Sequence, residues 1–141
     1  MSVLTDLILA GLDEAPSVSE SEQDSDRWPR ISVPGMDQVV LCSLWAILRG
    51  DAYRDEDVDA FTLAHEESAE GPWTVVVPAG LVGLLAGLPP DDMPRVAVAW
   101  SATEELQGTG PEELQDVLKR IVEFARRAVT ARATMLMWTC L

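Results

Sequence analysis

The acidic side chains between residues 55 and 66 have the types and spacing that could bind a metal ion. In a calcium loop, carboxylate oxygens at positions 1, 3, 5 and 12 surround the cation, because Ca²⁺ prefers six to eight oxygen ligands. Four carboxylates of this sequence match those positions: Asp55, Asp57, Asp59 and Glu66. The spacing therefore raises calcium binding as a hypothesis.

Three features of the same segment argue against calcium. Position 6, where glycine makes the sharp turn of the loop, is Ala60, and position 8, usually apolar, is Thr62. A turn at Gly71 and Pro72 follows where the exiting helix would run. The alternative is the start of a solvated acidic helix, with Asp55 as its N-cap and acidic residues in its first turn.

His65 is the only histidine, so a general base or an imidazole metal ligand has to be this residue. With Glu66 and Glu67 beside it, His65 is the candidate catalytic residue of a small enzyme. A zinc site with Cys42 and Cys140 would require three distant segments to converge. The two cysteines lack metal or redox spacing and are interpreted as buried thiols of a reducing compartment.

Trp28 is the tryptophan for which we predict exposure and a role in binding. It follows the acidic, serine-rich stretch 14–26 and is flanked by Arg27, Pro29 and Arg30. The other four tryptophans lie in apolar helix or strand patterns, where burial in the core is the simpler interpretation. Trp28 therefore joins Asp55, Asp57 and Asp59 as a candidate binding residue.

The net charge of −14 is concentrated in the first half of the chain. Residues 1–72 contain 16 acidic and 4 basic side chains, whereas residues 73–141 contain 8 acidic and 6 basic ones. A surface this negative repels nucleic-acid phosphates and anionic lipids, so we expect neither as a partner. Attraction to a basic protein, or solubility alone, explains the charge. No cofactor-binding motif is present, and we predict no cofactor.

The first half of the chain predicts two helices and a hairpin. Apolar residues at helical intervals indicate a short helix over 3–12, and the polar composition of 14–26 indicates a mobile loop. A helix over 36–50 ends at Gly50. Alternating residues on either side of a turn then predict a β-hairpin over 60–77.

The second half predicts three helices and a final strand. A helix follows Pro78, another spans about 92–107, and a long amphipathic helix covers 109–132. Residues 134–141 are apolar on both faces, which predicts a central strand or a strand at a subunit interface. The expected fold is a single α+β domain, 1–141, with about five helices and a small antiparallel sheet made of the hairpin and this strand.

Residues 77–141 resemble small uncharacterised bacterial proteins of the YfbM-like type. The resemblance lies in a proline-led helix, a helix that carries a tryptophan, a long helix and a closing strand. Three segments carry it: VPAGLVGLLAGL, WSATEEL and MLMWTCL. This family has no assigned activity, so the resemblance implies a fold and assigns no site residues.

The sequence leads to two functional hypotheses. The first is a non-enzymatic acidic interaction protein of the bacterial cytoplasm that binds a basic partner, as an immunity-type inhibitor of a toxin does, and that forms a homo-oligomer. The second is a small enzyme or ligand-binding domain that uses His65 and the carboxylates near it. The cytoplasmic expectation follows from the absence of a membrane-spanning apolar run and of a basic, cleavable N-terminal segment.

Overall fold

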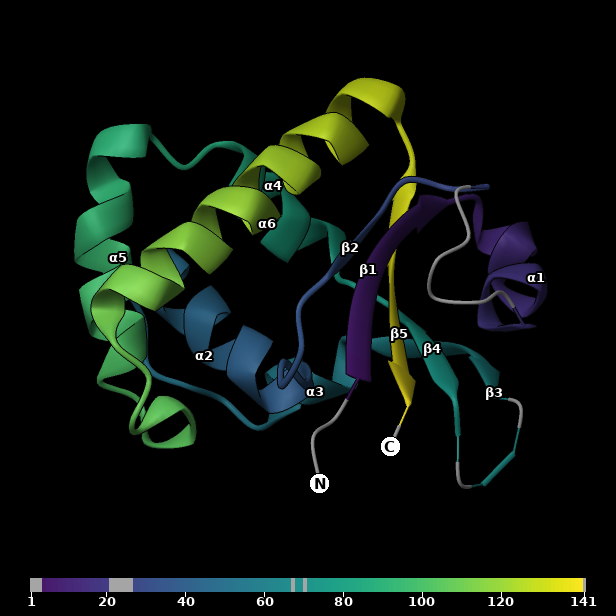
Figure 1. The fold of residues 1–141 in the computed structure, drawn as a ribbon, viewed down its shortest axis with the longest axis horizontal. Helices are drawn as coiled ribbons and strands as arrows, with labels where there is room; N and C mark the ends of the chain where they lie inside the picture. The colour runs from purple at the N-terminus through teal and green to yellow at the C-terminus, as the bar shows by residue number, and fades with distance from the viewer. Residues whose placement is uncertain (1–3, 21–26, 67, 70, 141) are drawn as a thin grey trace.

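A computed structural model describes residues 4–20, 27–66, 68–69 and 71–140 of the chain. These residues form an antiparallel five-stranded sheet with the strand order β2-β1-β5-β4-β3 (Figure 1). The strands are β1 (Leu4–Ala10), β2 (Arg30–Ser32), β3 (Thr62–Glu66), β4 (Trp73–Val76) and β5 (Thr134–Cys140). The fold is α+β, as predicted, but the sheet is larger than a hairpin plus one strand.

Helices cover both faces of this sheet. They are α1 (Ala15–Glu20), α2 (Gln38–Arg49), α3 (Glu56–Asp59), α4 (Ala79–Ala86), α5 (Met93–Ser101) and α6 (Pro111–Ala131). The helices α2, α4, α5 and α6 lie on one side of the sheet and enclose the main core, whereas α1 lies on the other (Figure 1). Under α1 is a second core, which consists of Ile8, Ala10, Ala15, Val18, Trp28, Leu136 and Trp138.

Most of the predicted elements are confirmed. Helix α2 ends where Gly50 takes the left-handed conformation, with φ 70°, which a glycine adopts at low energetic cost. The hairpin forms from β3 and β4, and the long helix begins at Pro111. The helix expected over 92–107 is shorter, because α5 ends at Ser101 and a separate turn, Glu104–Leu106, follows.

The prediction of a helix over residues 3–12 was wrong, because residues 4–10 form strand β1 in the middle of the sheet. Leu7 faces the main core and Ile8 faces the second core, and both are buried. A strand that is covered on both faces is apolar almost throughout, and a short apolar run does not distinguish a strand from a helix.

The prediction of a loop over residues 14–26 was wrong for its described part. Residues 15–20 form helix α1, whose Ala15 and Val18 are buried in the second core. The turn before it is held by the backbone N–H of Gly11, which donates to Glu14 Oε1 at 2.8 Å. Ala15 and Val18 lie one helical turn apart, so both side chains are on the face that meets the second core. Residues 21–26 lie outside the described part of the chain.

Strand β5 is a central strand, which was one of its two predicted positions. It pairs with β1 on one side and with β4 on the other, so both of its edges are used within the chain. A dimer that pairs two copies through the edge of this strand is therefore ruled out. Within the described ranges, no helix is both long and apolar enough to cross a membrane.

Burial of β1 on both faces predicts a large effect of truncation there. Ile8 has 0% of its surface exposed, so Ile8→Ala should lower the free energy of unfolding by about 2–4 kcal/mol. Leu12, which lies just after the strand and is 58% exposed, is the matched control. Leu12→Ala should change the free energy of unfolding by less than about 0.5 kcal/mol. Urea denaturation followed by circular dichroism measures both, and equal effects would contradict the position of β1.

Candidate functional site

The predicted acidic residues lie on and beside the short helix α3, between α2 and the hairpin. Asp55 and Asp59 are exposed at its two ends, whereas Asp57 is buried. Asp55 precedes the helix as predicted, but its side chain makes no capping hydrogen bond. The three aspartates are therefore not equivalent, and only Asp55 and Asp59 present their charge to solvent together with Glu56.

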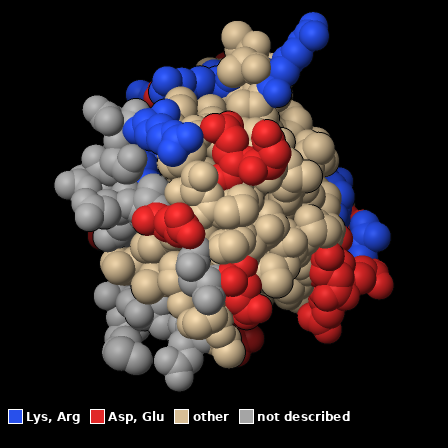
Figure 2. Space-filling model, turned by 90° about the vertical axis from the view of Figure 1, so that its right-hand side faces the viewer, with Lys and Arg blue, Asp and Glu red and all other residues tan. Residues whose placement is uncertain are grey.

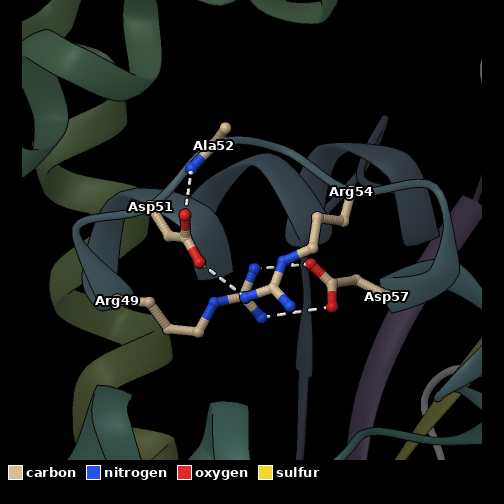
Figure 3. A network of polar contacts seen from close by, with 5 residues as sticks. All are labelled: Arg49, Asp51, Ala52, Arg54 and Asp57. Carbon is tan, nitrogen blue, oxygen red and sulfur yellow. Dashed lines mark hydrogen bonds and ion pairs between the residues drawn. The ribbon is translucent and has the colours of Figure 1, made fainter.

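Asp57 is held by Arg49, the last residue of α2 (Figure 3). Arg49 Nη2 donates to Asp57 Oδ2 at 2.6 Å and Nη1 donates to Oδ1 at 3.2 Å, while the guanidinium carbon lies 4.9 Å from the centre of the Trp45 ring. These hydrogen bonds lower the pKa of Asp57 and raise the pKa of Arg49 from their ordinary values. The pair joins α3 to the end of α2.

A second ion pair lies on the solvent side of the first. Arg54 Nη2 donates to Asp51 Oδ2 at 2.6 Å, and the backbone N–H of Ala52 donates to Asp51 Oδ1 at 2.9 Å. The hydrogen bond from Ala52, followed by the charge of Arg54, lowers the pKa of Asp51. Figure 3 shows the two arginine side chains meeting between the two aspartates. The basic residues of this region are thus used to fix the connection from α2 to α3.

The structure does not assemble the calcium loop that the spacing suggested. Both oxygens of Asp57 face Arg49, and Glu66 lies on β3, where its Oε1 accepts a hydrogen bond from Trp73 Nε1 at 3.0 Å. Among the described residues, no group of three or more His, Cys, Asp or Glu side chains could hold a metal ion. The carboxylates that are evenly spaced in the sequence do not surround one point, because β3 carries Glu66 away from α3.

His65 and Glu66 lie on opposite faces of strand β3. His65 is paired with Thr74, whose buried side chain lies on the face of the second core, and Glu66 is paired with Trp73 on the other face. The enzyme hypothesis needs both side chains at one point, so this arrangement does not support it. Glu67 lies outside the described residues.

The two cysteines also lie on opposite sides of the sheet. Cys42 belongs to the main core, whereas Cys140 packs against the second core, and neither forms a disulfide bond. Burial is the largest cause that raises the pKa of the Cys42 thiol to about 12, and the negative charge of Asp57 adds to the effect. Cys42 is therefore a protonated, unreactive core residue at neutral pH.

The prediction that Trp28 is exposed was wrong. Its ring is buried in the second core, its Nε1 donates to Glu14 Oε2 at 3.0 Å, and the guanidinium of Arg27 lies 4.4 Å from the ring centre. Flanking charges suggested exposure, but an indole ring with a hydrogen-bond partner for its N–H is stable in a core. Trp28 thus has a structural role and is not part of a binding surface.

A groove that sequence reasoning missed lies at the hairpin end of the sheet. It has a volume of about 370 Å³ and lies between the sheet and the start of α2. Its lining is Asp37, Gln38, Val39, Phe61, Leu63, Trp73, Val75, Met137 and Thr139. We call it the edge groove, because β3 is the outermost strand of the sheet. The alternation of apolar residues in the hairpin could have predicted one wall of the groove, because Leu63 and Val75 are paired and both line it.

Comparisons of the chain with family models, with curated proteins and with solved structures find no match. The functional argument therefore depends on the charges and surfaces of the chain itself.

The ion pair between Arg49 and Asp57 predicts an unequal response to loss of charge at two aspartates. Asp57→Asn should lower the free energy of unfolding by about 1–3 kcal/mol, because it leaves a largely buried guanidinium without its counter-charge. Asp51→Asn, in the exposed pair, should change stability very little. Chemical denaturation of both variants measures the difference, and similar losses would contradict the structural role of Asp57.

The lowered pKa of Asp57 predicts how this contribution depends on pH. An unfolded aspartate has a pKa of about 3.9, and the folded state keeps Asp57 ionised to a lower pH. The stabilisation is therefore complete above about pH 5 and is lost as the pH falls through the lowered pKa. The difference in unfolding free energy between wild type and Asp57→Asn should shrink from about pH 6 to about pH 3. A difference independent of pH would show that the substitution acts through packing.

Proposed function

We propose that this chain is a non-enzymatic acidic binding protein of the bacterial cytoplasm that recognises a basic protein partner. An immunity-type inhibitor of a basic toxin domain is the specific form of this hypothesis. The observation that supports it is the distribution of charge around α3. Asp55, Glu56 and Asp59 are exposed and, within the described part of the chain, take part in no ion pair.

The basic residues of the first half contact other side chains of the same chain instead. Arg30 pairs with Asp6 at 2.6 Å, and Arg49 and Arg54 form the two pairs beside α3. Arg27 lies over the ring of Trp28. These four are all the basic residues of positions 1–72, and each of them already contacts a side chain of its own fold.

The surface charge favours a basic partner of protein type. Figure 2, which views the molecule from the side of α1, shows acidic side chains in separate groups around uncharged side chains, with Lys and Arg toward the margins of that face. Carboxylates interspersed with uncharged atoms match a folded surface of mixed lysine, arginine and apolar residues, and they increase its rate of association. Two cysteines that form no disulfide bond, one of them in the main core, are consistent with a reducing cytoplasm.

Neutralising the acids around α3 should weaken binding of a basic probe more than neutralising the same number of acids elsewhere. The test variant is Asp55→Asn, Glu56→Gln and Asp59→Asn, and the control is Glu112→Gln, Glu113→Gln and Asp116→Asn, which are exposed at the start of α6. The probe is a lysine-rich peptide of about 20 residues. At about 0.1 M salt, charges more than about 10 Å away are screened, so local charges dominate.

We expect the α3 variant to bind the peptide about fivefold more weakly than wild type, from about 0.3 kcal/mol for each exposed charge. The control variant should lose less than about twofold. Isothermal titration calorimetry measures the affinities, and thermal melts confirm that both variants fold. Equal losses would show that only the net charge matters, and an absence of binding by wild type would overturn the proposed function.

A further inference from the structure

The edge groove lies close to α3 along the chain. Its floor consists of buried side chains, Phe61, Val75 and Met137, whereas its wall includes Leu63, which is 58% exposed. Phe61 follows the end of α3 at Asp59 by two residues. The groove and the acidic surface therefore meet along one short segment of the chain.

We propose that the edge groove receives one apolar side chain of the basic partner, flanked by lysine or arginine on both sides. This inference rests on the proposed function and names the part of the partner that is recognised. The volume of about 370 Å³ is near the lower limit of about 300–1,000 Å³ for ligand pockets, which suits one large side chain. An apolar centre with a charged rim is also the usual anatomy of a protein interface.

Two carboxylates beside the groove favour lysine or arginine on either side of the inserted side chain. Asp37 lines the groove at the start of α2, and its Oδ1 accepts a hydrogen bond from the backbone N–H of Val40 at 2.8 Å. Glu66 is held beside the groove by the indole N–H of Trp73, a lining residue. No lysine or arginine is among the lining residues. A cation next to the inserted side chain would meet these carboxylates without competition from a basic residue of the groove.

A segment that docks through its side chain fits better than an added β-strand or a second copy of the chain. The pairing of β3 with β4 is irregular between Leu63 and His65, and such a bulge bends the strand and interrupts a regular ladder on its outer edge. Two copies that each carry a net charge of −14 would repel one another at this acidic end. The groove and its carboxylates therefore favour a basic partner.

Two synthetic peptides test the inference directly. Each carries two lysines and a serine on either side of one central residue, which is leucine in the first peptide and alanine in the second, with both ends blocked. Wild type should bind the leucine peptide about tenfold more tightly, because the larger side chain buries more apolar surface. Leu63→Ser should remove this preference and leave the affinity for the alanine peptide unchanged.

Leu12→Ser is the matched control, because Leu12 is also 58% exposed but lies away from the groove lining. This variant should keep the tenfold preference for leucine. A second readout is ¹⁹F NMR of protein labelled with 5-fluorotryptophan. The signal of Trp73 is assigned because it is lost in Trp73→Phe. This signal should shift when the leucine peptide is added, whereas the signal of the buried Trp100 should not.

The possible outcomes distinguish failure of this inference alone from failure of the proposed function. Equal affinities of wild type for the two peptides, or equal effects of Leu63→Ser and Leu12→Ser, would overturn the groove inference and leave the acidic surface around α3 as the binding site. If neither peptide binds at low salt, the proposed function fails as well. A wild-type dimer in sedimentation that Leu63→Ser dissociates would show that a second copy occupies the groove, which also overturns the inference.

Discussion

The pairing of β1 with β5 is the interaction on which the rest of the structure depends. It runs in unbroken register from Leu4 opposite Cys140 to Ala10 opposite Thr134, and it joins the first and last strands of the chain at the centre of the sheet. The strand β2 is added on one side and the hairpin on the other, and α6 leads directly into β5. Because this centre joins residues at opposite ends of the sequence, closing it costs more entropy than any local contact. The apolar side chains of both strands, covered on two faces, offset that cost.

A buried ion pair connects the centre of the sheet to its edge and explains the position of Trp28. Arg30 donates through Nε and Nη2 to Oδ2 of Asp6 on β1, and both side chains are almost fully buried. Removing either partner would leave a charge without compensation inside the protein, so the pair fixes where β2 lies against β1. Trp28 is two residues before Arg30, and that short distance brings its ring over the second core. A residue that looks like an exposed contact in the sequence thereby closes the face that α1 covers.

The sequence predicts those parts of the fold whose signals are local. The long apolar stripe of α6, the stop at Gly50 and the alternation of the hairpin each depend on residues a few positions apart. Strand β1 could not be distinguished from a helix, because the partner that decides its conformation is β5 at the other end of the chain. The same limit applies to the site. Asp55, Asp57 and Asp59 are alike in the sequence. Only the hydrogen bond from Arg49 at the end of α2 gives Asp57 a structural role. One wall of the edge groove follows from the hairpin pattern, whereas the approach of α2 is a tertiary feature.

The net charge of −14 is larger than solubility alone requires. A small domain remains soluble with a net charge of about 2–8 units, and a larger charge destabilises the compact state by self-repulsion. This chain carries −14, while Arg30, Arg49 and Arg54 are engaged in internal ion pairs. The acidic side chains left at the surface therefore repel one another and reduce the stability that the two cores provide. A basic partner would relieve that repulsion when it binds, so the same carboxylates that destabilise the free protein would strengthen the complex.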